Sequence, residues 1–191
     1  KNNLQSVQSL VRMQDIPDDA KMDLQGRIAA MTAVHEHIYR LDQYREVEAH
    51  QFIPAIVEPL VRTYGADVRF EYDIAPLAVD RDHATPLALL VNEVVTNALK
   101  YAFPNHRAGM IRISLKPADN ERGILTISDD GVGFDTGNAT AGMGSRLVRG
   151  MVVQLEGTSS YVKENGTRFT ADISLRARGQ VPAPKAAAAS S

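Results

Sequence analysis

Cysteine and tryptophan are both absent from the 191 residues of this sequence. Without cysteine the chain has no disulfide framework and no thiolate metal site. No apolar run approaches the ~20 residues that a membrane-spanning helix needs, and the opening residues KNNLQSVQ do not form a signal peptide. We therefore expect a cytoplasmic chain without membrane contact of its own, either alone or as the cytosolic part of a longer membrane-attached protein.

An excess of charge of one sign is also missing. The sequence has 21 Lys and Arg against 23 Asp and Glu, for a net charge of −2, and it has no long basic run. This balance predicts no nucleic-acid partner. Apolar residues make up 44% of the chain, which is enough to build a packed core in one large domain or two small ones.

The amino-terminal part is predicted to be a helical hairpin. Residues 1–16 and 20–45 each carry an apolar stripe, and Pro17 separates them. A lone hairpin buries two such stripes poorly, so we expect a homodimer through residues 1–46 in which two hairpins form a four-helix bundle. The alternative is a hairpin packed against its own domain. Residues 47–51 read as a polar joint, where we place the domain boundary.

The remainder predicts an α+β sandwich, with three helices on one face of a mixed sheet. The expected helices are 52–64, 89–103 and 145–155, and the expected strands are 68–74, 77–80, 110–115, 124–128, 159–163 and 168–175. The expected domains are the hairpin at 1–47, the sandwich at 48–178 and a disordered low-complexity tail at 179–191.

The helix predicted at residues 89–103 carries a polar stripe opposite its apolar face. Glu93, Asn97 and Lys100 are spaced i, i+4 and i+7 on this stripe. Carboxylate and carboxamide oxygens suit Mg²⁺, and an ammonium group suits a phosphate bridged to that cation. The alternative is a solvated helix face with a helical salt bridge.

A glycine motif, Asp129-Asp130-Gly131-Val132-Gly133, directly follows a predicted strand. Gly131 and Gly133 let the backbone turn and approach a ligand closely. Asp129 can accept a hydrogen bond from an exocyclic amine such as that of adenine. The alternative is an ordinary turn rich in Asp and Gly.

Two further glycine segments follow along the chain. Gly142-Met143-Gly144-Ser145 leads into a predicted helix, whose first backbone N–H groups and positive dipole end suit a phosphate; the alternative is a plain N-cap by Ser145. Gly166-Thr167 belongs to a predicted hairpin turn, and the Thr167 hydroxyl can reach a base edge or a water beside Asp129.

The helix stripe with Glu93 and Asn97 and the three glycine segments occur in this order along the chain. In this order they resemble the ATP-binding domain, of the Bergerat or GHKL type, that sensor histidine kinases share with type II topoisomerases, Hsp90-type chaperones and mismatch-repair ATPases. The resemblance runs from about residue 50 to residue 176. The flanking segments KNNLQ, HEHIY and NEVVTNALKYAFP are similar to histidine kinases with the second type of dimerisation and phosphoacceptor domain. These are relatives of the subfamily named for its His, Trp and Glu signatures, and the absence of Trp places this chain beside that subfamily.

The resemblance implies ATP and Mg²⁺ as ligands. Asn97 would hold the Mg²⁺ that bridges the ATP phosphates, and Glu93 would orient or deprotonate the attacking group. The other residues that it implies at the ATP site are Lys100, Tyr101, Asp129, Gly131, Gly133, Gly142, Gly144, Ser145 and Thr167. Residues 134–141 would form a short ATP lid.

The implied function is that of a two-component sensor histidine kinase core, which uses ATP to phosphorylate its own histidine and passes the phosphate to a response-regulator aspartate. In that family the phosphorylated histidine lies a few residues before KNN, so we expect the phosphoacceptor upstream of Lys1, in a longer sensor protein. His35 and His37 are expected to be structural. The alternatives are a phosphotransfer or phosphatase scaffold with weak or no ATP use, and a non-kinase binding module on the same ATP fold.

Overall fold

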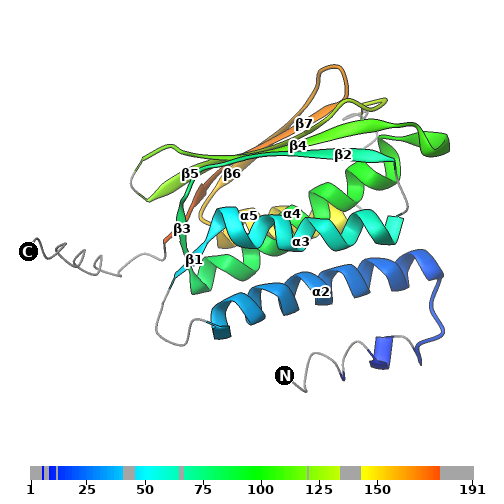
Figure 1. The fold of residues 1–191 in the computed structure, drawn as a ribbon, viewed down its shortest axis with the longest axis horizontal. Coiled ribbons are helices and arrows are strands. Elements are labelled where there is room, and N and C mark those ends of the chain that lie inside the picture. The colour runs from blue at the N-terminus through cyan, green and yellow to red at the C-terminus, as the bar shows by residue number, and fades with distance from the viewer. Residues whose placement is uncertain are drawn as a thin grey trace, which may run out of the picture.

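The computed structural model describes residues 6, 9–11, 13–40, 46–64, 67–119, 121–133 and 143–176. Half of the helix predicted at residues 1–16 lies outside these ranges, as do the predicted lid at 134–141, Gly142 and the predicted tail at 179–191. The described part is an α+β sandwich in which helices cover one face of a mixed sheet (Figure 1), as the sequence predicts.

The main sheet has five strands in the order β2-β4-β5-β7-β6. Its strands are β2 (Val68–Ile74), β4 (Gly109–Pro117), β5 (Arg122–Asp129), β6 (Thr158–Lys163) and β7 (Thr167–Ser174). β2 pairs with β4 in parallel, and the other neighbours are antiparallel. Alternate side chains of β4, including Ile111, Ile113 and Leu115, point into the helix layer, so one sheet face forms the core and the other is polar.

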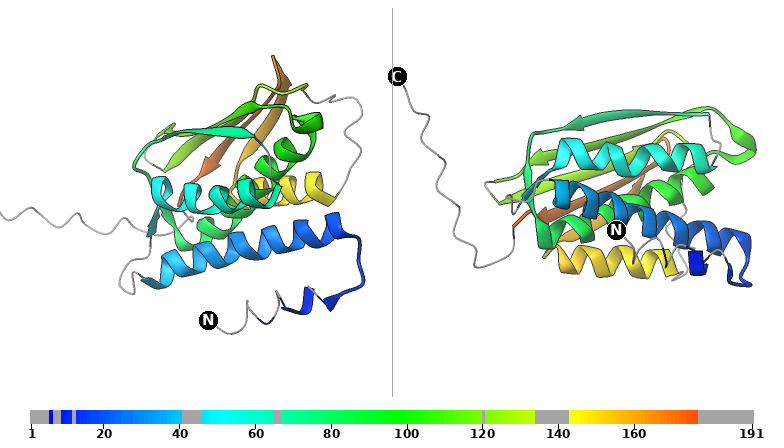
Figure 2. Two further views of the ribbon diagram at one scale, coloured as in Figure 1. Left: turned by 45° about the vertical axis from the view of Figure 1, so that its right-hand side comes forward. Right: turned by 60° about the horizontal axis from the view of Figure 1, so that its bottom comes forward.

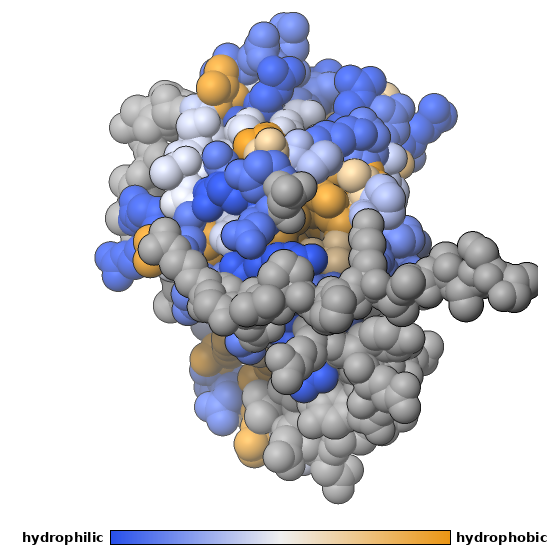
Figure 3. Space-filling model, turned by 90° about the vertical axis from the view of Figure 1, so that its left-hand side faces the viewer, coloured by the Kyte–Doolittle hydropathy of each residue, from blue (hydrophilic) through white to orange (hydrophobic). Residues whose placement is uncertain are grey.

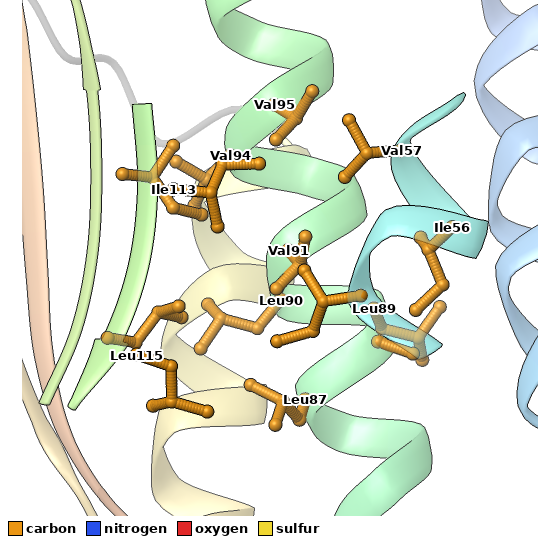
Figure 4. Close-up of a cluster of buried hydrophobic side chains, with 14 of the residues drawn as sticks. Ile56, Val57, Leu87, Leu89, Leu90, Val91, Val94, Val95, Ile113 and Leu115 are labelled. Atoms are coloured by element: carbon orange, nitrogen blue, oxygen red, sulfur yellow. The ribbon is translucent and has the colours of Figure 1, made fainter. Parts of the chain in front are cut away.

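Three helices, α3 (Ala49–Tyr64), α4 (Arg81–Tyr101) and α5 (Met143–Gln154), form the layer beneath the sheet (Figures 1 and 2). α4 is central: Figure 4 shows Leu90 and Val94 between the sheet residues Ile113 and Leu115 and the rest of the helix layer, with Val57 of α3 facing α4. No helix in the described ranges is both long enough and apolar enough to cross a bilayer.

A fourth helix, α2 (Asp18–Arg40), lies on the outer side of this layer (Figures 1 and 2). It packs against α3 and α4 of its own chain. The homodimer through residues 1–46 stays a prediction. Ala30 is buried in the same hydrophobic core as α3 and α4, whereas Leu24 and Met31 are partly exposed. α2 therefore forms an additional layer over α3 and α4.

The boundaries of β1, α4 and α5 are among those that differ from the prediction. The predicted polar joint at residues 47–51 contains β1 (Glu46–Glu48), which pairs antiparallel with β3 (Ala78–Asp80), and α3 begins directly after it. The joint was wrong because Val47 is buried against Val79 although its neighbours are polar. α4 begins eight residues earlier than predicted because it continues through Pro86, and α5 begins at Met143.

The small β1–β3 sheet lies at the end of the molecule that Figure 3 views face-on. Hydrophilic residues dominate the described part of that face and surround small hydrophobic patches. The candidate site residues lie elsewhere, on the second half of α4 and on the elements around it.

Candidate functional site

The start of α5 approaches the polar residues of α4 closely. A Cβ atom placed on Gly144 would lie 3.3 Å from Oε2 of Glu93 and 3.8 Å from Oδ1 of Asn97. The amino-terminal end of α5, with its positive dipole, therefore faces a carboxylate and a carboxamide. The combination of this helix end with an oxygen donor such as Asn97 is suited to a phosphate and its cation.

Glu93 is buried, with 4% of its surface exposed. Arg27 of α2 donates two hydrogen bonds to its carboxylate, from Nε to Oε1 at 2.6 Å and from Nη2 to Oε2 at 2.9 Å. Asn92 Nδ2 adds a longer hydrogen bond of 3.3 Å to Oε1. The hydrogen bonds to Glu93 raise the pKa of Arg27. The alternative of a solvated helix face is thus wrong for Glu93, whose ion-pair partner comes from another helix.

Lys100 also pairs with α2. Its Nζ lies 2.5 Å from Oδ1 of Asp23, and the Tyr64 hydroxyl donates a hydrogen bond of 3.1 Å to the same oxygen. Burial raises the pKa of Tyr64, and the negative charge of Asp23 raises it further. Two neighbouring turns of α2, those of Asp23 and Arg27, therefore contact two charged residues of the predicted site.

Asp23 and Arg27 are not among the residues that the sequence pattern predicts for the site. Their one available signal is a pair of opposite charges spaced i, i+4 on the long amino-terminal helix, and such pairs are common on solvated helix faces. Recognising them as partners of Glu93 and Lys100 requires knowing that α2 packs on α4, which no local pattern reveals.

A second group of predicted residues meets at the end of β5. Oδ1 of Asp129 accepts hydrogen bonds from the backbone N–H of Gly131, at 3.0 Å, and of Thr167, at 3.2 Å. Burial raises the pKa of Asp129, and these hydrogen bonds, together with one from the Thr167 side chain, act against that rise. Asp129 is thus held in a fixed orientation by the two segments that the sequence analysis associated with it.

Glycine is required at two positions of this group. A Cβ atom on Gly166, whose φ is +124°, would lie 2.0 Å from the backbone oxygen of Asp129. A Cβ atom on Gly131 would lie 2.3 Å from the carbonyl oxygen of Ala102, where the Val132 N–H donates to that oxygen at 3.0 Å. Both glycines therefore allow backbone contacts that fix the surroundings of Asp129.

The remaining predicted residues are placed as follows. Tyr101 ends α4 and is 66% exposed, so its predicted place in a pocket wall stays a prediction. Ser145 lies in the first turn of α5 and not at its N-cap position. Gly133, with φ of +75°, lies beside Lys163 and Gly166, and Gly142 lies outside the described residues.

Tyr161 of β6 is a neighbour of the site that the sequence analysis missed. It pairs across the strands with Phe169, with ring centroids 4.9 Å apart. Burial raises the pKa of Tyr161 to about 12, and the charge of Glu93 adds to this effect. Tyr161 therefore shares a sheet face with the buried Phe169, although 36% of its own surface stays exposed.

The donor set fits a cation that arrives together with phosphate. Among the residues with described positions, no three His, Asp or Glu side chains gather into a metal site. Glu93 is occupied by Arg27, which leaves the carboxamide of Asn97 as the oxygen donor beside α5. Mg²⁺ is commonly held by one or two protein oxygens, substrate phosphates and water, and this arrangement fits such a site.

Sequence models of two families match the chain. Residues 82–177 match the family described as histidine kinase-, DNA gyrase B- and HSP90-like ATPase. Residues 1–64 match a family described as histidine kinase. The first match contains α4, the glycine segments and the hairpin at Thr167, and the second contains α2 and α3.

Several curated relatives are similar to the chain. The sensor histidine kinase PdtaS of Mycobacterium tuberculosis is 25% identical over 95% of this chain and 39% of its own length. Blue-light-activated histidine kinase 2 of Erythrobacter litoralis is 34% identical over 47% of this chain and 26% of its own. The chain thus spans about two fifths or less of the length of these relatives.

Solved structures show the same fold. The histidine kinase domain of a blue-light activated histidine kinase from Erythrobacter litoralis has a TM-score of 0.74 at 23% identity, and the similarity covers 92% of this chain and 89% of that one. A mycobacterial sensor histidine kinase, MprB, has a TM-score of 0.56 at 23% identity, covering 69% of this chain and 97% of that one.

Proposed function

Since the chain belongs to the histidine kinase-, DNA gyrase B- and HSP90-like ATPase family, we propose that it is the ATP-binding core of a two-component sensor histidine kinase. In this proposal the γ-phosphate of ATP passes to a histidine upstream of Lys1 and then to an aspartate of a response regulator. The observation that carries the proposal is the convergence of Asn97, the start of α5 at Gly144 and the oriented Asp129 around the second half of α4.

Asp129 would recognise the adenine. The backbone N–H groups of Gly131 and Thr167 hold one carboxylate oxygen, which orients the side chain to accept a hydrogen bond from the exocyclic amine. A buried carboxylate that accepts from this amine regains part of the hydration energy lost on burial. Thr167, hydrogen-bonded to Asp129, would assist through its hydroxyl.

Asn97, Lys100 and the start of α5 would hold the phosphates. The amino-terminal end of α5 favours anions, and Lys100 adds a positive charge on the same side of α4. When bound with ATP, Mg²⁺ would neutralise phosphate charge, with Asn97 as its protein ligand. Glu93 would orient the attacking imidazole or accept its proton, which requires Arg27 to move away from the carboxylate.

The helices before the ATP-binding part would provide the homodimer contact and the response-regulator surface. The match of residues 1–64 to the histidine kinase family supports this assignment. Leu24 and Met31 of α2 stay partly exposed while α2 packs on α3 and α4, which leaves apolar surface for a second copy.

The test is phosphorylation of a protein that carries this chain together with its upstream histidine. With Mg²⁺ and γ-labelled ATP we expect label that is stable in alkali and labile in acid, as a phosphohistidine is, and that moves to a receiver domain. Asn97→Asp should lose the label. Label that is absent from a folded protein that binds ATP would contradict the kinase assignment, and absence of ATP binding as well would favour the phosphotransfer scaffold.

A further inference from the structure

α2 presents two opposite charges, one helical turn apart, to two charged residues of the proposed ATP site. Asp23 contacts Lys100, and Arg27 contacts Glu93 through two hydrogen bonds. All four side chains are at least two-thirds buried: the exposed fractions are 29% for Asp23, 18% for Lys100, 15% for Arg27 and 6% for Glu93. α2 therefore occupies charged groups that the proposed function assigns to phosphate and to the attacking histidine.

We propose that α2 is a latch whose docking competes with Mg²⁺·ATP for the charged residues of α4. This inference rests on the proposed function, because it requires a nucleotide site at Asn97 and Lys100. In the latched state, which the structure describes, Asp23 and Arg27 hold Lys100 and Glu93. In the released state, Lys100 turns to the phosphates and the carboxylate of Glu93 becomes accessible to the phosphoacceptor.

Electrostatics makes the two states exclusive. A phosphate bound at Lys100 would bring negative charge close to the Asp23 carboxylate in a partly buried setting, where repulsion is weakly screened. The Arg27 guanidinium, with both hydrogen bonds directed to Glu93, blocks that carboxylate from orienting an imidazole or accepting its proton. Nucleotide binding and α2 docking therefore make opposing demands on the same side chains.

The interface between α2 and the helix layer is suited to opening. Gly26, between Asp23 and Arg27 on α2, lies close to Oδ1 of Asn92, a buried oxygen with no hydrogen-bond partner among the described residues. A cavity of about 240 Å³ separates parts of α2 and α3 nearby, lined by small and apolar residues that include Ala29, Ala33 and Pro59. The cavity and the unsatisfied oxygen lower the packing and hydrogen-bond energy of this part of the interface, although Ala30 of α2 belongs to the same hydrophobic core as α3 and α4.

Thermodynamic linkage gives the latch two measurable consequences. If α2 docking weakens nucleotide binding, nucleotide binding must weaken α2 docking by the same factor. The amides of residues 21–30 report docking through hydrogen exchange, and calorimetry with Mg²⁺ and a non-hydrolysable ATP analogue reports binding. Both measurements use the whole chain.

Saturation with the analogue and Mg²⁺ should raise amide exchange at residues 21–30 about fivefold or more, the lower end of usual coupling strengths. Exchange in β4 and β5 should stay unchanged, because the sandwich stays folded. Faster exchange confined to α2 is the result that the latch requires.

The variants Asp23→Asn and Arg27→Gln alter charge in opposite directions, yet each removes one latch contact. Both variants should raise amide hydrogen exchange at residues 21–30 in the absence of nucleotide. Because no phosphate is present in that experiment, an effect of the altered charge on phosphate binding cannot produce this result. Asp23→Asn should also bind the analogue about fivefold more tightly. The control is Asp73→Asn, which removes the same charge from the surface pair between Asp73 and Lys116 and should behave as the unmodified chain does.

The outcomes separate the two proposals. Analogue binding with unchanged or slower exchange in α2 would overturn the latch and leave the nucleotide site in place. Absence of binding in the unmodified chain together with binding by Asp23→Asn would support a tight latch. Absence of binding in both, with both folded, would overturn the proposed function and the latch with it.

Discussion

Arg27 and Glu93 are 66 residues apart in the sequence, yet they form an ion pair with two hydrogen bonds, of 2.6 and 2.9 Å, in the structure. The pair joins α2, from the segment that matches the histidine kinase family, to α4 in the ATPase-like part. It places the predicted catalytic carboxylate in contact with a cation that the sequence analysis did not assign to it. Communication between the two parts of the chain can therefore run through this contact.

Removal of one partner of this pair should destabilise the fold. Glu93→Gln leaves Arg27 partly buried without its carboxylate, so we expect the free energy of unfolding to fall by about 1–3 kcal/mol. Denaturant unfolding measures this change, with Glu71→Gln as the control, because Glu71 pairs with Arg112 at an exposed site and should cost about 1 kcal/mol or less.

The double variant Arg27→Gln/Glu93→Gln, together with the two single variants, forms a double-mutant cycle that measures the interaction between Arg27 and Glu93. The double variant removes both charges, so its free energy of unfolding should fall by less than the sum of the falls in the two single variants. The difference, which is the coupling free energy, should be about 0.5–3 kcal/mol. Effects of the two single variants that simply add would show that the ion pair does not form in solution.

Gly144→Ala should weaken nucleotide binding without harming α5. Its Cβ would lie 3.3 Å from Oε2 of Glu93 and close to Asn97, in the space that we propose for the phosphates. We expect Mg²⁺·ATP affinity to fall about tenfold, or 1.4 kcal/mol. Gly150→Ala is the matched control in the same helix, because a Cβ there meets nothing within 4 Å; it should stabilise the fold by roughly 0.5–1 kcal/mol and keep full affinity. Equal affinities of the two variants would argue against phosphate binding at the start of α5.

Asp129→Asn should abolish ATP binding without lowering the stability of the fold. The amide oxygen of Asn can still accept from the backbone N–H groups of Gly131 and Thr167, and the cost of burying a charge disappears. We therefore expect stability at pH 7 equal to or above that of the unmodified chain, and loss of ATP binding because an amide NH₂ would face the adenine amine. Denaturant unfolding and calorimetry on the same sample test both halves, and a variant that binds ATP normally would refute the adenine role of Asp129.

The protonation of Asp129 should respond to nucleotide. Burial raises its pKa in the free chain, so the folded state binds this proton more tightly than the unfolded state does. The contribution of Asp129 to stability is accordingly greatest in acid and falls as the pH rises from the unfolded pKa through the raised folded value.

Adenine binding has the opposite effect, because the amine donates to the ionised carboxylate. A ¹³C NMR titration of the Asp129 carboxyl should therefore give a lower pKa with saturating ATP than without it. The affinity for ATP should fall as the pH is lowered toward the raised pKa of the free chain. A pKa that ATP leaves unchanged or raises would contradict the proposed contact.

Much of the fold follows from local patterns. The alternating residues of VRFEYDI predict β2 with the bounds that it has, and the apolar stripe of residues 89–103 predicts most of α4. The hairpin at Glu164-Asn165-Gly166 follows from turn chemistry, with Asn165 and Gly166 both at positive φ. In each case the determining interactions lie within a few residues of one another, so the sequence contains them directly.

Features that depend on distant contacts were not predicted. β1 is three residues long and exists because Val47 packs beside Val79, and α4 continues through Pro86 within a well-packed layer. The spacing of Glu93 on its own helix was also compatible with a solvated face, because its ion-pair partner, Arg27, lies on α2. The structure places Thr167 beside Asp129, as the sequence pattern predicts. The contacts of Glu93 with Arg27 and of Lys100 with Asp23 were not predicted.

Mg²⁺-dependent ATP binding by calorimetry tests the nucleotide site most directly. We expect the folded chain to bind one ATP in the presence of Mg²⁺. Asn97→Asp and Asp129→Asn should lose this binding, and Gly150→Ala should keep it. Unchanged binding by Asn97→Asp and Asp129→Asn would place the nucleotide elsewhere. If neither the folded chain nor Asp23→Asn, whose latch contact is removed, binds ATP, the proposed nucleotide site at Asn97 and Asp129 is wrong.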